Sequence, residues 1–337
     1  EVPPLSFSFP ILHLQWYPYR KVAFPKATGC GLWRSMQMKY GIGAVNSLLI
    51  EDPTAMRDVA QAAEGLGYDF LTLIDHVLLA YPAADGTPRA HYPARTPYHD
   101  ILVALGYLGG VTTRIFLRSA VVIMPQRGPA VVAKQAAAVD SLSGGRLELG
   151  LGIGWHREEY DALEIPFTER GRRMDEGVEL MKLLWTQDRV DFDGRYYKVD
   201  GMGMEPKPVT QPHPPIWFGG TTPPVFRRVV EHGVGWLSRP VQTIEEIDAS
   251  WKEILRLAAD TGREADALRL HVSVGLGPEE TTDRIVANVR RMISLGATDV
   301  SFFTSYMPGI ETVGDHIAQL ERAMTEVVPA ARPGGLS

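Results

Sequence analysis

The sequence contains a single cysteine, Cys30, among its 337 residues, so no disulfide can form within the chain. No apolar stretch approaches the ~20 residues that a membrane-spanning helix needs. Long basic runs are missing and the formal net charge is −6, which argues against nucleic acid as a partner. The His/Glu spacing of zinc proteases is also missing. These absences predict a cytoplasmic protein that uses neither a membrane, nor nucleic acid, nor a metal ion.

The first 37 residues differ in character from the rest of the chain. They have no helix or strand periodicity, and they lack the basic start, apolar centre and cleavage site of a signal peptide. A clean strand pattern begins at Met38. We therefore expect residues 1–37 to be a disordered or non-native extension and residues 38–330 to form one domain.

From Met38 onward, short apolar runs alternate with helical stretches. The expected strands are residues 40–45, 70–74, 115–122, 147–152, 216–218, 235–237, 270–274 and 299–303. The expected helices are residues 54–66, 100–109, 130–142, 169–185, 224–232, 244–261, 279–295 and 313–327. Alternating strands and helices predict a parallel sheet, and this number of repeats predicts a (β/α)8 TIM barrel. An open doubly wound sheet is the alternative, but it normally has only about six strands.

Two segments interrupt the alternation, and both are expected near the C-terminal mouth of the barrel. Residues 190–199 have the pattern of a β-hairpin that turns at Asp193-Gly194. Residues 77–99 are rich in proline, tyrosine and histidine, and long loops of this kind are commonly functional. The aromatic residues expected either to line a substrate pocket or to pack within a lid are Tyr81, His91, Tyr92 and Tyr98.

Residues 143–160 read SGGRLELGLGIGWHREEY and place three alternating glycines in a strand. In a dinucleotide-binding turn the glycines follow the first strand, with an acidic residue about 20 positions later. Here they fall in the fourth strand. Gly150, Gly152 and Gly154 are therefore expected either to clear space for a flat ring or only to relieve crowding inside the barrel. The run REEY at 157–160 is expected to be a solvated helix start.

Several longer segments carry a resemblance to a known family. They are FLTLIDHV (70–77), LRSAVVIMPQRGPAVVAKQAAAVDSLSGGR (117–146), SGGRLELGLGIGWHREEYDALEIPFTERGRRMDEGVELMKLLW (143–185) and DGRYYKVDGMGMEPKPVTQPHPPIWFGG (193–220). The chain resembles the luciferase-like monooxygenase superfamily, and within it the actinobacterial oxidoreductases that depend on the deazaflavin coenzyme F420. The resemblance implies a TIM barrel that binds flavin or deazaflavin at its C-terminal mouth.

Asp75 and His76 end the second expected strand, where barrel enzymes collect catalytic groups. Histidine titrates near neutral pH, so His76 is the first candidate to move a proton during hydride transfer. The alternative is a histidine held by a backbone carbonyl. The resemblance places Asp75-His76 beside the cofactor ring. It also implies a non-prolyl cis peptide between Ala120 and Val121, after Ser119, that backs this ring.

The turn after the fifth expected strand consists of Gly219, Gly220, Thr221 and Thr222. A helix follows it, and helix N-termini bind phosphate through free N–H groups and the helix dipole. This turn is therefore expected to hold the cofactor phosphate, with simple capping by Thr222 as the alternative. Either Arg227 or Arg228 of the helix is expected to screen the anion.

Trp155 and His156 follow the glycine strand. Sugar-phosphate dehydrogenases of the superfamily have an acidic residue at about the place of Trp155, so a sugar phosphate is not expected as substrate. Trp155 is expected to stack on the substrate or to wall its pocket. His156 is expected to be a second proton donor.

The leading functional hypothesis is an F420-dependent oxidoreductase that transfers a hydride between the cofactor and a small organic molecule. The alternative is an FMN-dependent monooxygenase that receives reduced flavin from a partner reductase and reacts with dioxygen. A cofactor-binding protein without turnover is the third, because a fold alone does not imply a function. Relatives are commonly dimers, so a homodimer is expected.

Overall fold

The computed structural model describes residues 38–47, 52, 54–92 and 94–332, so the expectation for residues 1–37 lies outside the described residues. One parallel sheet closes on itself, because β3 pairs with β5 as well as with β2. β3 and β4 are two parts of one barrel strand, and the barrel is therefore eight-stranded. This arrangement confirms the predicted (β/α)8 barrel over the open sheet.

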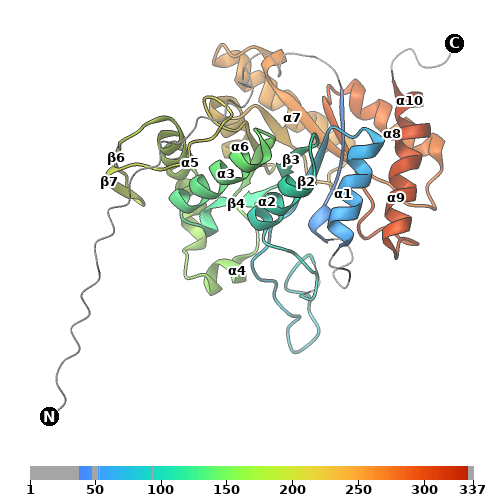
Figure 1. Ribbon diagram of the computed structural model, residues 1–337, viewed down its shortest axis with the longest axis horizontal. Helices are drawn as coiled ribbons and strands as arrows, with labels where there is room; N and C mark the ends of the chain where they lie inside the picture. The colour runs from blue at the N-terminus through green and yellow to red at the C-terminus, as the bar shows by residue number, and fades with distance from the viewer. Residues whose placement is uncertain (1–37, 48–51, 53, 93, 333–337) are drawn as a thin grey trace, which may run out of the picture.

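The barrel strands are β1 (Lys39–Ile42), β2 (Phe70–Leu73), β3 (Phe116–Ser119), β4 (Val122–Ile123), β5 (Leu147–Gly152), β8 (Ile216–Gly219), β9 (Gly235–Leu237), β10 (Arg269–Gly275) and β11 (Asp299–Phe303). The larger helices lie around this sheet (Figure 1). They are α1 (Ala55–Leu66), α2 (Ile101–Val111), α3 (Pro129–Ser143), α5 (Arg170–Thr186), α6 (Pro223–His232), α7 (Ile244–Asp260), α8 (Thr282–Ser294) and α9 (Val313–Arg322). The last expected helix is longer than α9, because a π-helical turn, Ala323–Val327, interrupts it before α10 (Val328–Ala331).

The expected hairpin is present, but its turn and its location differ from the prediction. Its strands are β6 (Val190–Asp193) and β7 (Lys198–Met202), joined by residues 194–197 rather than by a two-residue turn. Glu176 of α5 accepts hydrogen bonds from the backbone N–H groups of this loop. The hairpin therefore lies along α5 and away from the 77–99 segment, and its expected place at the mouth is wrong (Figure 1).

A charged cluster fills the barrel interior near the N-terminal ends of the strands. The Arg118 guanidinium lies 4.0 Å from the ring centroids of both Phe70 and Trp217. It forms ion pairs with Glu148 and, at 2.8 Å, with Asp299, and all three charged side chains are fully buried. Charges this deep are tolerated only when they are paired. The cluster therefore fills this end of the barrel interior with paired charges and aromatic rings.

Burial also determines the charge of His271 on β10. Its Nε2 lies 3.0 Å from the Ser301 hydroxyl, and its ring meets Phe70 edge-on at 5.6 Å. Burial, assisted by the nearby Arg118 charge, lowers the pKa of His271 to about 3. The imidazole is therefore neutral at physiological pH, and the barrel interior gains no further positive charge.

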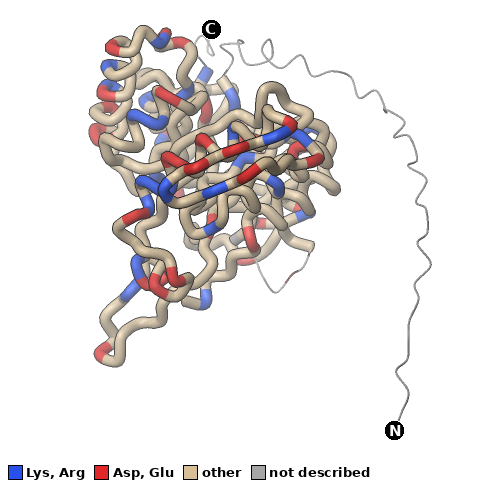
Figure 2. Tube along the Cα trace, turned by 90° about the vertical axis from the view of Figure 1, so that its left-hand side faces the viewer, with Lys and Arg blue, Asp and Glu red and all other residues tan. Residues whose placement is uncertain are grey.

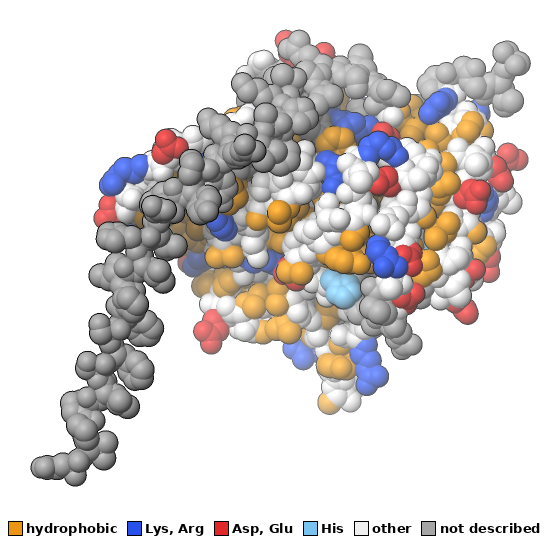
Figure 3. Space-filling view, viewed as in Figure 1, with side chains coloured by type: hydrophobic (Ala, Val, Ile, Leu, Met, Phe, Trp, Pro, Cys, Tyr) orange, Lys and Arg blue, Asp and Glu red, His pale blue; other side chains and the backbone are white. Residues whose placement is uncertain are grey.

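Acidic and basic residues are interspersed along the chain (Figure 2). Apolar side chains gather over α2 and α3 (Figure 3). The exposed members on these helices are Val103, Tyr107, Val131 and Leu142. Within the described part of the chain, no helix has the length and apolar character needed to cross a membrane.

Candidate active site at the C-terminal mouth

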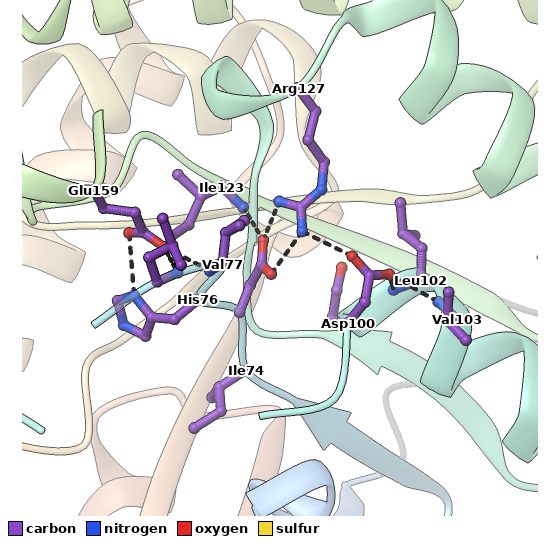
Figure 4. A network of polar contacts seen from close by, with 12 residues as sticks. Ile74, His76, Val77, Asp100, Leu102, Val103, Ile123, Arg127 and Glu159 are labelled. Atoms are coloured by element: carbon purple, nitrogen blue, oxygen red, sulfur yellow. Dashed lines mark hydrogen bonds and ion pairs between the residues drawn. The ribbon is translucent and has the colours of Figure 1, made fainter. Parts of the chain in front are cut away.

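His76 follows the end of β2 and is held by a carboxylate that comes from a distant part of the chain. Its Nδ1 lies 3.2 Å from Oε2 of Glu159, a residue of the short helix α4 (Arg157–Ala162). The other carboxylate oxygen accepts hydrogen bonds from the N–H groups of Val77, at 2.6 Å, and Leu78, at 3.1 Å. Figure 4 shows His76 and the start of the 77–99 segment converging on Glu159. One carboxylate therefore fixes both the imidazole and the loop.

The Glu159 carboxylate is ionised at neutral pH. Burial by itself raises its pKa. The opposing effects outweigh burial and lower the pKa, and they are hydrogen bonding from His76, a favourable interaction with Gln126 and the Leu78 N–H. An ionised carboxylate only accepts hydrogen bonds, so the Nδ1 atom of His76 must carry a proton. The Nε2 atom is then the ring nitrogen without a proton when the imidazole is neutral.

Glu159 is only 1% exposed, which corrects the expectation that residues 157–160 form a solvated helix start. Its neighbour Tyr160 is also buried and donates a hydrogen bond to the Ile153 carbonyl at 2.6 Å. Nothing in the polar run distinguishes Glu159 from Glu158. Only the contact with His76, 83 positions away, singles out Glu159.

Asp75 is held by contacts from within the chain. Its carboxylate accepts hydrogen bonds from the Ile123 N–H at 2.9 Å and from Arg127 at 2.5 and 2.9 Å, and its side chain is fully buried. Arg127 also reaches Asp100, the N-cap of α2 (Figure 4). These contacts tie the strand end that carries His76 to the segment after the cis peptide, and they occupy both carboxylate oxygens of Asp75.

Aromatic rings from three loops surround His76. We call His76, Tyr92, Tyr98, Trp155 and Tyr306 the ring cluster. The ring centroids of Trp155, Tyr98 and Tyr92 lie 5.5, 5.6 and 5.8 Å from that of His76. Tyr306, in the loop after β11, lies 6.3 Å from Tyr92 and donates a hydrogen bond of 3.4 Å to the Tyr98 hydroxyl. Tyr306 is not among the residues expected at the site, because nothing in its local sequence links it to the 77–99 segment.

The other aromatic candidates divide between this cluster and the exterior. His91 packs on Trp155 at 4.3 Å between ring centroids. Tyr81 is 62% exposed and takes part in no ring contact described here, so it is not brought to the cluster. His156 stacks on Trp155 at 5.0 Å but is only 2% exposed, with Glu158 at 3.5 Å. Burial behind Trp155 argues against the expected role of His156 as a proton donor to substrate.

A non-prolyl cis peptide joins Ala120 to Val121, where the resemblance implied one. It separates β3 from β4, so the expected continuous strand 115–122 is interrupted there. The glycines make room for this irregular segment. A Cβ atom at Gly150 would lie 2.0 Å from the Ser119 carbonyl oxygen, and one at Gly152 would lie 2.3 Å from the Val121 side chain.

Two further glycines face the same segment. A Cβ atom at Gly154 would lie 2.8 Å from Ile123, and one at Gly219 would lie 2.9 Å from Val121. Of the two readings of the glycine strand, relief of crowding is therefore the one that the contacts support. Ala120 and Val121 are half-buried, so this apolar segment is partly accessible.

The turn of Gly219, Gly220, Thr221 and Thr222, which is expected to bind phosphate, directly precedes α6. The hydrogen-bond donors that it offers differ from those of a usual helix N-terminus. Pro223 and Pro224 begin α6 and have no N–H groups, and the Val225 N–H is bonded to the Thr222 carbonyl at 2.8 Å. Thr222 makes no side-chain capping bond, and Thr221 and Thr222 are exposed. The hydroxyls and backbone of these two residues, rather than the helix N–H groups, are thus the donors available to a phosphate.

The two arginines of α6, Arg227 and Arg228, differ in burial and in their contacts. Arg228 is buried and forms an ion pair with Asp175 of α5 and a 3.1 Å hydrogen bond to the Gly171 carbonyl. These contacts commit Arg228 to helix packing, which favours Arg227 of the two candidates expected to screen the anion. Arg227 is exposed and stays a candidate. Among the described residues, no group of histidine, cysteine, aspartate and glutamate side chains is arranged to hold a metal ion.

Comparisons with known proteins agree with this geometry. The family model of the luciferase-like monooxygenases matches residues 34–326. The F420-dependent glucose-6-phosphate dehydrogenase of Nocardia farcinica is 30% identical over 73% of this chain and 71% of its own length. The FMNH2-dependent dimethylsulfone monooxygenase of Pseudomonas putida is 28% identical over 71% of this chain and 62% of its own length.

Solved structures show the same fold at lower sequence identity. An F420-dependent secondary alcohol dehydrogenase, solved with an F420–acetone adduct, superposes with a TM-score of 0.71 at 17% identity. The superposition covers 88% of this chain and all of the other. The chain belongs to the luciferase-like monooxygenase family, in which its relatives include both F420-dependent and FMN-dependent oxidoreductases.

Proposed function

We propose that this protein is an F420-dependent oxidoreductase that transfers a hydride between the deazaflavin and a small organic substrate. The observation that carries the proposal is the buried Glu159–His76 pair at the end of β2, the strand that pairs with β3 and so lies next to the half-buried Ala120 and Val121. Hydride transfer to or from a carbonyl carbon requires a proton to move at its oxygen, and a histidine oriented by a carboxylate is suited to that task. The F420-dependent relative supports the same reading.

The residues present fit such a cofactor. Ala120 and Val121 would back its ring, and Thr221 and Thr222, with Arg227 nearby in sequence, would hold its phosphate. Reduced F420 supplies a hydride when bound. The chain itself would orient the substrate, and Nε2 of His76 would take a proton when an alcohol is oxidised or give one when a carbonyl is reduced. Glu159 would stabilise the imidazolium that exists between these steps.

Direct binding separates the proposed cofactor from FMN. We expect F420 to quench the protein's tryptophan fluorescence on titration and to raise the melting temperature, because a ligand that binds only the folded state stabilises it. FMN and reduced FMN are titrated in parallel. Tighter binding of reduced FMN than of F420, together with consumption of dioxygen, would support the monooxygenase instead.

Replacing Thr221 by glutamate tests the phosphate site. Gly220 is unsuitable for this purpose, because its φ of 124° is rarely adopted by residues with a side chain. Glutamate near a helix N-terminus is compatible with folding but repels a phosphate. We expect Thr221→Glu to weaken F420 binding about tenfold, equivalent to about 1.4 kcal/mol. Thr221→Gln, of equal size and no charge, is the control, and equal affinity of the two variants would move the phosphate elsewhere.

We also propose that two copies associate through the apolar face of α2 and α3. Val103 and Tyr107 are one helical turn apart on α2, and they are 67% and 42% exposed. Exposed apolar side chains that gather on one face commonly mark an interface. We expect sedimentation to give the mass of a dimer for the native chain and of a monomer for Val103→Glu. Val241→Glu, at a residue that is 78% exposed elsewhere, should stay dimeric.

A further inference from the structure

The ring cluster presents flat, exposed apolar surface to a ligand. This surface lies beside the His76 imidazole. Trp155 is 39% exposed and Tyr306 is 59% exposed, although both contact other rings. Val77 and Leu78, which the Glu159 carboxylate holds by their N–H groups, add side chains that are 45% and 49% exposed. Exposed apolar surface gathered around a few polar groups is typical of a small-molecule site.

The charges at the cluster disfavour an anionic group beside His76. The ionised Glu159 carboxylate lies 3.2 Å from the imidazole, on the Nδ1 side. The pair is therefore negative when the imidazole is neutral and uncharged when it is protonated, and it is never positive. An anion placed at Nε2 would gain no attraction from it and would lose its hydration.

The tyrosines of the cluster are uncharged hydrogen-bond donors. Burial raises the pKa of both Tyr92 and Tyr98, and the neighbouring Tyr306 raises them further. The Tyr98 and Tyr306 hydroxyls lie 3.4 Å apart, and the hydrogen of a neutral phenol hydroxyl can also turn to another acceptor. A carbonyl oxygen beside His76 would be such an acceptor.

We propose that the ring cluster binds an uncharged, planar carbonyl compound whose carbonyl is conjugated to an aromatic or unsaturated ring. Its ring would stack on Trp155, and its carbonyl oxygen would lie beside His76 and Tyr98. This inference rests on the proposed function, because it names the substrate class of the same site. In the reduction, the C=O π bond breaks, the hydride supplied by reduced F420 forms the new C–H bond, and the Nε2 proton of protonated His76 forms the O–H bond.

Isothermal titration with matched probes tests the proposal on the cofactor-free and the F420-loaded protein. Benzamide is the planar uncharged probe, benzoate is its anionic isostere, and cyclohexanecarboxamide lacks the flat ring. We expect benzamide to bind about tenfold more tightly than either of the others. Trp155→Leu should weaken benzamide binding about fivefold. Tyr81→Leu, at an exposed tyrosine of the 77–99 segment outside the cluster, should not change it.

Three results would overturn the assignment: equal binding of benzamide and benzoate, no preference for the planar ring, or unchanged benzamide affinity in Trp155→Leu. Benzoate binding that disappears in Arg239→Gln would place an anion site at Tyr92, where the Arg239 charge acts, and would also overturn it. The three probes are also measured on the cofactor-free protein, so their relative affinities can be determined even if F420 does not bind. That outcome would contradict the proposed function and not the ligand class.

Discussion

Replacing His76 by alanine should lower turnover about 100-fold or more while F420 binds with nearly unchanged affinity. Glu159 occupies Nδ1 of His76, so Nε2 is the atom proposed to exchange a proton with the substrate. The imidazole is not part of the proposed cofactor contact at Ala120 and Val121, so its loss should change F420 affinity little. The rate is measured by stopped flow as reoxidation of reduced F420 by an aryl ketone, a cyclic enone or a quinone. Affinity is measured separately by fluorescence titration.

Glu159→Gln separates the role of His76 as a proton carrier from a merely structural one. The amide oxygen can still accept from the Val77 and Leu78 N–H groups, so the loop keeps its anchor. The amide cannot stabilise an imidazolium, however, and we expect turnover to fall about tenfold or more with a changed pH profile. If His76→Ala turns over at the native rate, the proton comes from Tyr98 or from solvent, and the assignment of His76 is wrong.

Replacing Arg118 by methionine should lower the free energy of unfolding by about 3–5 kcal/mol, the usual effect of removing one partner from a buried ion pair. Methionine fills most of the space between Phe70 and Trp217, so the loss reflects charge more than volume. Glu148 and Asp299, both fully buried, would lose their shared cation. Urea denaturation followed by circular dichroism measures the change.

Two variants show whether the unpaired charge is the cause. Without Arg118, Asp299 keeps Arg269 at 2.9 Å, whereas Glu148 keeps the more distant Lys39 at 3.9 Å. Adding Glu148→Gln to Arg118→Met removes this more weakly paired carboxylate and should recover part of the stability. Arg256→Met on α7 also breaks two ion pairs, but these are exposed, and the denaturation midpoint should stay unchanged. Equal losses in the single and double variants would mean that packing around Arg118, not its charge, stabilises the barrel.

The sequence by itself determined the architecture of this protein. Strand and helix periods repeat along the chain, and each repeat is local, so a (β/α)8 barrel followed from pattern and number alone. The position of His76 after β2 was readable for the same reason, because a strand end is a local feature and barrel mouths lie at the strands' carboxyl ends. The resemblance located the cis peptide before Val121, which no local residue requires.

Only the tertiary structure decided which side chains act together. Glu158 and Glu159 are adjacent and chemically identical, yet α4 turns one toward His76 and the other toward the surface. Tyr306 reaches Tyr98 from the opposite end of the chain, and Arg228 turns from the mouth to Asp175. These contacts depend on how separate loops meet after the barrel closes, and a linear sequence does not encode those distances in any one segment.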